Sequence, residues 1–288
     1  MMHCHKRPRR GYSQSPIVIV VGVLTCCAAC PAPEPYYDAQ LNMEAVPVEE
    51  GAMAGLFALK IQSTTETEIP LLGKVVGGGD TYALVNRVFN PEDQTYSQET
   101  ALCGGLIRSE NSESTIDDDD WQKVPSMAPR ALELNDGEGY LAVDGYIELW
   151  GLHNLSDPWT DPLPADEVEA EEPPFRDQIV DMDEDGNPGM TIHVDGLVSG
   201  DFYFVQRKTA DLEGILLGPD RTLGLQVTQF EQTILGSDSG PTQQGYPQNP
   251  HPDPMQSWFE EVRLSEDATC DDVMDAVTDG RLSRLRPF

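Results

Sequence analysis

Short runs of alternating apolar and polar residues recur along the first half of the chain and predict β-strands. β-Branched and aromatic residues fill these runs, and glycine or proline stands at their ends, as is typical of strands. Between two of the runs, Gly77–Asp80 predicts a turn, and the polar segment Ser109–Asp120 predicts a solvated loop. The predicted strands of this half are Ala54–Ile61, Thr81–Phe89, Thr95–Cys103, Ala131–Leu134 and Tyr140–Trp150.

The second half of the chain continues in the same style. In Thr222–Phe230 the apolar residues take every second position, which is the pattern of a strand with one face on a core. Cys270–Val277 predicts a helix, because its apolar residues fall on one face. The other strands predicted in this half are Met190–Val194, Asp201–Arg207 and Ser257–Leu264.

These elements predict a mainly β fold, an antiparallel β-sandwich or barrel with a short C-terminal helix. Many short strands separated by glycine and proline turns favour this class. A doubly wound α/β fold is disfavoured, because no strand is followed by a clear amphipathic helix. The similar style of the two halves raises the further expectation of two β-rich units.

An acidic segment, Asp157–Asp185, separates the two halves. It carries 12 acidic residues and a single basic one, Arg176, together with five prolines. Such a run cannot bury itself and predicts a loop or linker. The expected division of the chain is a signal peptide at 1–29, a Pro/Glu-rich tether at 30–50, a first half at 51–156, the acidic linker at 157–185 and a second half at 186–288.

The charge balance narrows the choice of partners. The chain has 50 Asp and Glu residues against 18 Lys and Arg residues, and its formal net charge is −32. Phosphate groups are bound by clustered basic residues, so nucleic acid is not an expected partner.

The N-terminal residues have the layout of an export signal. A basic head, His5–Arg10, precedes the apolar run Ile17–Leu24, which is too short to span a membrane. The following Cys27-Ala28-Ala29-Cys30 resembles the lipobox of bacterial lipoproteins, in which the last cysteine receives the lipid, although leucine is usual where Cys27 stands. Leu24-Thr25-Cys26-Cys27 is a second possible lipobox and would place the lipid on Cys27. An ordinary secretory signal cleaved near Ala29 is the other interpretation.

The resemblance to bacterial envelope lipoproteins implies a location and a partner. It implies a lipid-anchored protein of the outer membrane or cell surface, with a secreted or periplasmic protein as the alternative. Apart from Cys30, the exported chain would keep Cys103 and Cys270. An oxidising compartment favours a disulfide between these two, and separate buried thiols are the alternative.

One acidic turn has the residue spacing of a calcium loop. Asp181-Met182-Asp183-Glu184-Asp185-Gly186 places carboxylates at alternate positions before a glycine, and calcium binds six to eight such oxygens. The run resembles the first half of the EF-hand loop and the calcium repeats of thrombospondin and dockerin modules. By that resemblance the backbone carbonyl of Asn187 is the next ligand.

The second half of the run departs from an EF-hand. Ile192 stands where the bidentate glutamate belongs, and Pro188-Gly189 interrupts the loop. We therefore expect a structural calcium turn within a β-hairpin, with Asp195, Asp177 or a distant loop supplying the missing carboxylate. An acidic β-turn without metal is the alternative.

No catalytic motif emerges from the sequence. The histidines beyond the signal, His153, His193 and His251, have neither zinc-site nor triad spacing. Glu148 and Asp144 could form a carboxylate pair only if the fold brought them together. The aromatic residues that could line a cavity, or simply form the core, are Trp121, Trp150, Trp159, Trp258, Tyr140, Tyr146, Phe202 and Tyr203.

The sequence therefore predicts a non-catalytic, lipid-anchored envelope protein with one structural calcium loop. A β-barrel carrier of a lipid or small hydrophobic ligand is the first alternative. A secreted hydrolase without a recognisable motif is the second, and another envelope protein remains a possible partner.

Overall fold

The strands of this protein build one antiparallel sheet that closes on itself. The structure, a computed structural model, describes residues 43–69, 73–109, 112–196, 199–238 and 248–282, which belong to one compact unit. The predicted signal peptide, most of the tether and both candidate lipidation sites, Cys27 and Cys30, lie outside the described residues. The strands are β1 (Gly55–Ile69), β2 (Gly73–Asn90), β3 (Thr95–Ser109), β4 (Ser112–Thr115), β5 (Ala131–Asn135), β6 (Tyr140–Trp150), β7 (Met190–Gly196), β8 (Gly200–Leu216), β9 (Arg221–Ser237), β10 (Asn249–Pro250) and β11 (Trp258–Arg263).

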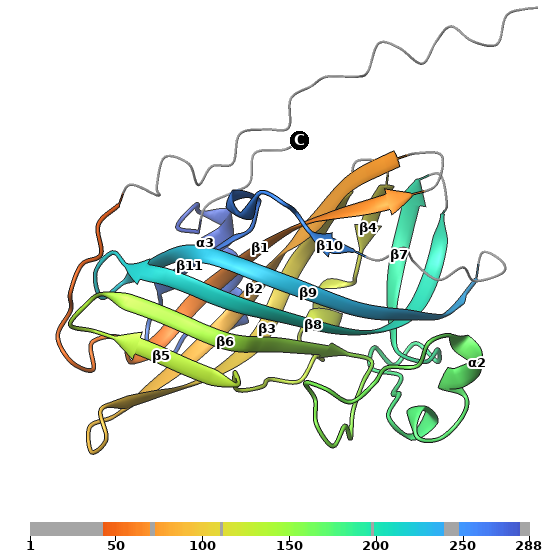
Figure 1. The fold of residues 1–288 in the computed structure, drawn as a ribbon, viewed down its shortest axis with the longest axis horizontal. Coiled ribbons are helices and arrows are strands. Elements are labelled where there is room, and N and C mark those ends of the chain that lie inside the picture. The colour runs from red at the N-terminus through yellow and green to blue at the C-terminus, as the bar shows by residue number, and fades with distance from the viewer. Residues whose placement is uncertain (1–42, 70–72, 110–111, 197–198, 239–247, 283–288) are drawn as a thin grey trace, which may run out of the picture. The chain divides into compact units, whose positions relative to one another are not determined.

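Eight strands form a closed ring in the order β8-β7-β4-β3-β2-β1-β11-β9, and β9 returns to β8 (Figure 1). The pairings are antiparallel throughout. Strand β8 pairs along one edge with β9, and along the other edge first with β7 and then with β6. The predicted class, mainly β with an antiparallel sheet and a short C-terminal helix, is confirmed, and strands from both sides of the acidic segment belong to the same ring.

Two sequence predictions about the connections are wrong. Gly77–Asp80 is no turn but part of β2, where Gly78 and Gly79 let the neighbouring strands approach. A Cβ on Gly78 would lie 2.0 Å from the Ser63 carbonyl oxygen, and a Cβ on Gly79 would lie 2.7 Å from that of Leu106. Only glycine fits such contacts, so here glycine marks a close approach of strands.

The second wrong prediction concerns Ser109–Asp120, which is not a plain solvated loop. It contains β4 and all but the last residue of the short helix α1 (Asp118–Trp121). Strand β4 pairs with β3 on one side and with β7 on the other. These four residues therefore close the ring.

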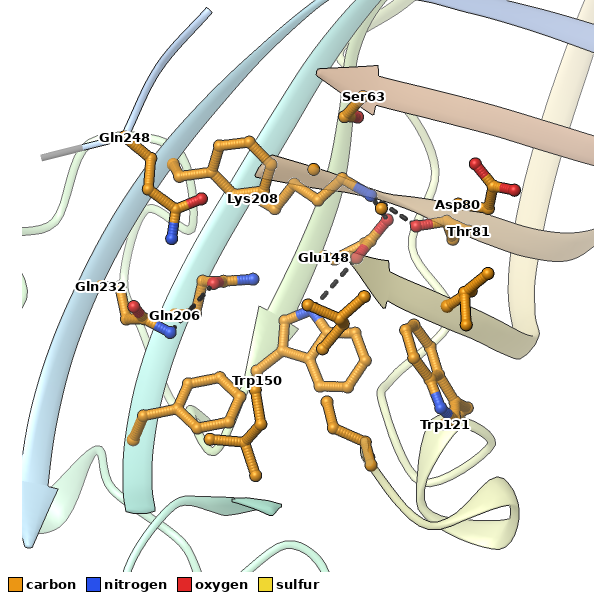
Figure 2. A pocket seen from close by; sticks show the side chains of 18 residues that line it. Ser63, Asp80, Thr81, Trp121, Glu148, Trp150, Gln206, Lys208, Gln232 and Gln248 are labelled. Carbon is orange, nitrogen blue, oxygen red and sulfur yellow. Dashed lines mark hydrogen bonds and ion pairs between the residues drawn. The ribbon is translucent and has the colours of Figure 1, made fainter. Parts of the chain in front are cut away.

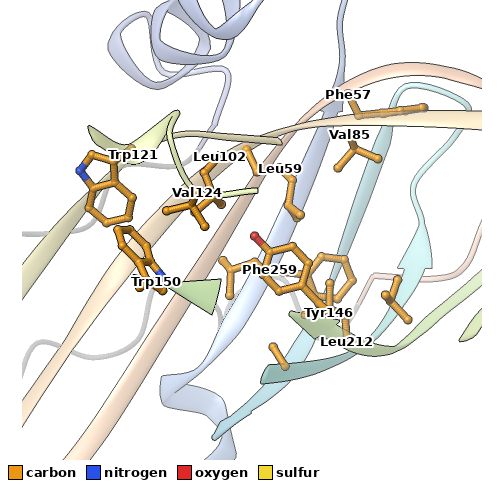
Figure 3. Packing of buried hydrophobic residues seen from close by; sticks show 14 of the residues in the cluster. Phe57, Leu59, Val85, Leu102, Trp121, Val124, Tyr146, Trp150, Leu212 and Phe259 are labelled. Carbon is orange, nitrogen blue, oxygen red and sulfur yellow. The ribbon is translucent and has the colours of Figure 1, made fainter. Parts of the chain in front are cut away.

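The main hydrophobic core fills the inside of the ring. Alternate residues of the long strands point into it, as Phe57, Leu59 and Ile61 of β1 do, while Ala58 faces the opposite side. Figure 3 shows side chains from several strands and from the α1 region meeting in this core. Fully buried members include Phe57, Leu59, Val85, Leu141, Leu212 and Phe259.

A β-bulge changes which residues of β6 face the core. Leu141 and Val143 point inward, but the register against β8 shifts between Val143 and Tyr146. One extra residue in a strand moves all later side chains to the other face. After the bulge Tyr146 and Trp150 belong to the interior, while Ile147 and Leu149 pack on the outside.

The helix α3 (Cys270–Thr278) covers the outer face of β1, β2 and β3. A capping box between Thr269 and Asp272 begins the helix, and Val273 and Ala276 are fully buried beneath it. The predicted disulfide between Cys103 and Cys270 is present, with an S–S distance of 1.99 Å. It ties the helix covalently to β3 across a sequence separation of 167 residues.

The acidic segment covers another outer face of the barrel. It contains α2 (Glu167–Ala170) and the 3₁₀ helix η2 (Phe175–Asp177). The apolar residues of the acidic segment, among them Trp159, Leu163 and Ile179, pack on side chains of β6, β8 and β9. Elsewhere in the chain, the 3₁₀ helix η3 (Pro254–Gln256) precedes β11. Among the helices of the described residues, none is long and apolar enough to cross a membrane.

Candidate functional site

A cavity of about 110 Å³ lies inside the ring, at the polar end of the core. Nearly every strand of the barrel contributes to its wall, and Figure 2 shows the side chains converging on it. Gln248 is exposed to solvent, so the wall extends to the surface. The residues that line it include Ser63, Asp80, Thr81, Ile116, Trp121, Glu148, Trp150, Ile192, Phe204, Gln206, Lys208, Phe230, Gln232 and Gln248.

Aromatic rings form one wall of the cavity. Trp121 and Trp150 meet edge to face, with ring centroids 4.9 Å apart and an interplanar angle of 86°. Phe204 follows at 6.5 Å from Trp150. Each of these three side chains is at least nine-tenths buried, so the wall is rigid and apolar.

A buried ion pair lies next to this wall. Lys208 Nζ donates hydrogen bonds to Glu148 Oε1 at 2.7 Å and to Thr81 Oγ1 at 2.5 Å. Trp150 Nε1 donates to the other carboxylate oxygen, Glu148 Oε2, at 3.1 Å. The side chains of Lys208 and Glu148 are only 6% and 2% exposed. Burial of both charges carries a desolvation cost, which their attraction and these added hydrogen bonds offset.

The β6 bulge is the reason that this ion pair lies inside. Glu148 and Trp150 come after the bulge and share the inward face with Tyr146. Without the extra residue, Ile147 and Leu149 would point into the barrel instead. No local signal in the sequence predicts this change of face.

Amide side chains form a third part of the wall. Gln206 and Gln232 face each other from β8 and β9, and Gln232 Nε2 donates to Gln206 Oε1 at 3.3 Å. Gln248 lies near them, as Figure 2 shows. Within the described residues, the amide nitrogen of Gln206 and the amide oxygen of Gln232 make no other side-chain hydrogen bond. The cavity therefore offers hydrogen-bond donors and acceptors at one end.

The structure separates the aromatic residues suggested by the sequence. Trp121 and Trp150 line the cavity, and Tyr146 and Phe202 belong to the core or pack against it. Trp159 and Tyr203 pack in the outer cluster under the acidic segment, and Trp258 packs in another cluster with Leu223. The polar residues Lys208, Gln206 and Gln232 were missed, because charged and amide residues on a strand ordinarily predict its solvent face.

The suggested carboxylate pair of Glu148 and Asp144 is not formed. Asp144 lies at the bulge with 56% of its side chain exposed, 4.0 Å from Arg130, whereas Glu148 is buried. Among the histidines, His193 Nδ1 lies 2.5 Å from Asp201 Oδ1, and this hydrogen bond raises the pKa of His193. His153 is exposed. His251 Nε2 lies 3.7 Å from Glu66 Oε1, and among the described residues that line the cavity there is no histidine.

The aspartates of the predicted calcium loop do come together. Carboxylate oxygens of Asp181, Asp183 and Asp185 lie within 4.8 Å of one another. The loop closes through backbone hydrogen bonds from Met182 to Gly189 at 2.9 Å and from Gly189 to Val180 at 3.0 Å. It stands directly before β7 and follows η2, so the expectation of a turn within a β-hairpin is wrong.

Hydrogen bonds inside the loop satisfy most of these oxygens. Backbone amides of Asp185 and Gly186 donate to Asp181 at 3.2 and 3.0 Å. Thr191 donates its backbone amide to Asp183 Oδ2 and its hydroxyl to Asp185 Oδ2, both at 2.6 Å. Asp183 Oδ1 is buried and has no hydrogen-bond partner among the described residues.

The environment splits the pKa values of two of the aspartates. Burial, followed by the charge of Asp185, raises the pKa of Asp183. Burial also acts to raise the pKa of Asp185, but hydrogen bonds from Thr191 and Asn187 outweigh it, so this pKa is lowered. Of these two carboxylates, Asp183 is therefore the one whose negative charge is less well compensated.

Two other predicted ligands have different surroundings. Asn187 donates its backbone and side-chain amides to Asp185 at 2.7 and 3.0 Å, which places it within the loop. Asp195 lies towards the far end of β7, accepts a hydrogen bond from Ser199 at 3.2 Å and is not part of the aspartate cluster.

Lys123 connects the aspartate loop to α1. Its Nζ atom donates to the Asp183 carbonyl oxygen at 2.6 Å and lies 2.8 Å from an Asp120 carboxylate oxygen.

Comparison of the chain with protein-family models, with curated proteins and with solved structures finds no match in any of the three. Its function is therefore argued from the cavity and the aspartate loop.

We expect removal of one partner of the buried ion pair to be costly. In Lys208→Met the Glu148 carboxylate keeps its charge without a counter-ion, which should lower the free energy of unfolding by about 3–5 kcal/mol in urea denaturation. The double variant Lys208→Met/Glu148→Gln should recover most of the loss. As a control, Lys74→Met removes a 68% exposed lysine from its pair with Glu66 and should change stability far less, because water and salt screen an exposed pair. Equal effects of Lys208→Met and Lys74→Met would contradict burial of the pair.

Proposed function

We propose that this protein binds one small, partly apolar molecule inside its β-barrel and acts as a carrier rather than an enzyme. The cavity inside the closed ring supports this proposal, because it combines aromatic walls with a few convergent polar groups. Eight strands enclose an interior that is either filled by side chains or holds one small ligand.

The size and chemistry of the cavity favour a ligand over a packing defect. Its volume of about 110 Å³ approaches that of an engineered apolar cavity of roughly 150 Å³ that binds benzene. A packing defect would have apolar walls throughout, whereas the wall of this cavity includes Lys208, Glu148 and three glutamines. Catalysis is not part of the proposal, because both Glu148 oxygens are already hydrogen-bonded to Lys208 and Trp150.

The proposed place of action is the bacterial cell envelope, with the barrel tethered through a lipid on Cys30. The lipobox-like Cys27-Ala28-Ala29-Cys30 supports the anchor. The disulfide between Cys103 and Cys270 supports an oxidising compartment, since such bonds are rare in the cytosol.

We also propose a structural calcium ion at Asp181, Asp183 and Asp185. The clustered carboxylate oxygens supply hard ligands, and the buried, unpartnered Asp183 Oδ1 supports a cation beside it. The backbone carbonyl of Asn187 is a further candidate ligand, and Asp195 is a weaker one because it lies outside the cluster. The ion would stabilise the junction between the acidic segment and β7.

Filling the cavity should weaken ligand binding. Benzene is the probe, and saturation-transfer NMR on the full chain is the measurement. The wild-type protein should give a transfer signal, and Ile192→Trp should weaken binding at least tenfold, because Ile192 lines the cavity and the larger ring takes up part of its volume. Val227→Trp, at a position of β9 that is 51% exposed, is the control and should bind as the wild type does. An unchanged signal in Ile192→Trp, or none in the wild type, would refute the proposal.

Calcium should stabilise the folded protein against heat. At a concentration 100 times Kd, a ligand that binds only the folded state adds about 2.7 kcal/mol of stability, which calorimetry detects as a raised Tm. Asp183→Asn keeps the shape of the side chain but removes its charge, and it should lose this shift. Asp195→Asn, outside the cluster, should retain it. If magnesium at equal ionic strength raised Tm as much as calcium, general screening of charge would explain the effect instead.

Labelled palmitate should enter the full chain in bacterial cells through Cys30. Cys30→Ser should lose the label, whereas Cys27→Ser should keep it. The reverse pattern would move the lipid to Cys27. Absence of label from the wild-type chain would remove the anchor from the proposal.

A further inference from the structure

The charges around the cavity cancel. Three charged residues line it: the side chains of Glu148 and Lys208 point inward, whereas Asp80 precedes the inward-facing Thr81 and turns its carboxylate to the other face of the sheet. Lys208 is paired with Glu148 at 2.7 Å, and Asp80 lies 3.3 Å from the ammonium group of Lys60, with both side chains at most 2% exposed. Each ionised group of the wall therefore already has a counter-charge.

This cancellation decides what kind of ligand the cavity accepts. An ion that enters loses its hydration shell, and only a counter-charge inside the site can offset that loss. An anion would also have to approach a protein of formal net charge −32. A cation is attracted from a distance, but inside it meets Glu148, whose oxygens are held by Lys208 and Trp150. Neutral molecules carry neither penalty.

The polar end of the cavity favours a ligand that can form hydrogen bonds. Gln206 and Gln232 share one hydrogen bond of 3.3 Å, which leaves a donor on Gln206 and an acceptor on Gln232 unused within the described residues. Gln248 lies beside them at the mouth (Figure 2). A ligand that both donates and accepts hydrogen bonds matches these amides, and its ring matches the wall of Trp121, Trp150 and Phe204.

We infer that the ligand is an uncharged ring compound with hydroxyl or amide substituents. Its polar substituents contact Gln206 and Gln232, and its ring packs against Trp150. The inference rests on the proposed function, since it specifies the chemical class of the molecule that the same cavity binds.

Four probes of similar size separate this inference from the proposed function. They are benzene, benzamide, the benzoate anion and the benzylammonium cation, each titrated into the full chain and followed by saturation-transfer NMR. Benzamide should bind at least tenfold more tightly than either ion, and more tightly than benzene. Equal or tighter binding of benzoate or benzylammonium would overturn the inference while the cavity remains a binding site. Failure of all four probes to bind would refute the proposed function itself.

Two variants connect the selectivity to the named residues. Gln206→Leu should weaken benzamide about tenfold and leave benzene unchanged, because only the amide contact is lost. Glu148→Gln leaves Lys208 without its counter-charge and should raise the affinity for benzoate relative to benzamide at least tenfold. Glu261→Gln is the matched control, since it changes another buried pair, with Arg87 at 2.8 Å, that does not line the cavity. A benzoate preference that rose equally in Glu261→Gln would contradict the role of Glu148.

Discussion

Closure of the ring by β4 is the constraint on which the interior depends. Only four residues, Ser112–Thr115, bridge β3 to β7, and their backbone hydrogen bonds turn an open sheet into a barrel. An open sheet would expose two edges of unpaired backbone groups and admit water to the core. The buried ion pair of Glu148 and Lys208 needs that exclusion of water, because its attraction is strong only in a medium of low polarity.

Much of the fold could be predicted from the pattern of residues. The strands around Thr81–Phe89 and Tyr140–Trp150 and the helix at Cys270 were predicted close to their places, because β-branched and apolar periodicity reports local structure. Strand β4 was not predicted, since a short polar strand is held by its neighbours and carries no periodic signal of its own. The turn predicted at Gly77–Asp80 was wrong for a related reason. In a sequence, a glycine that allows two strands to approach closely cannot be distinguished from a glycine in a turn.

The site was predicted only in part. The aspartates at 181, 183 and 185 converge because a single short loop carries them, and spacing within a loop can be seen in the sequence. The cavity depends instead on partners far apart in the chain, such as Lys208 and Thr81, which the ring brings together. The bulge in β6 turns the residues that follow it, including Glu148, towards the interior. Strict alternation from Leu141 and Val143 would place Glu148 on the outer face. Asp195 was also predicted wrongly as a member of the cluster. It is near the aspartates in sequence, but β7 carries it away from them in space.

The disulfide has a consequence for the integrity of the chain after cleavage. Every strand from β4 to β11 lies between Cys103 and Cys270, within one covalent loop. A protease that cut the exposed acidic segment would leave two fragments joined by a sulfur–sulfur bond, with β6 and β7 still hydrogen-bonded to the same β8. A nicked molecule would thus keep its barrel closed, because the disulfide and the strand pairing hold the two fragments together.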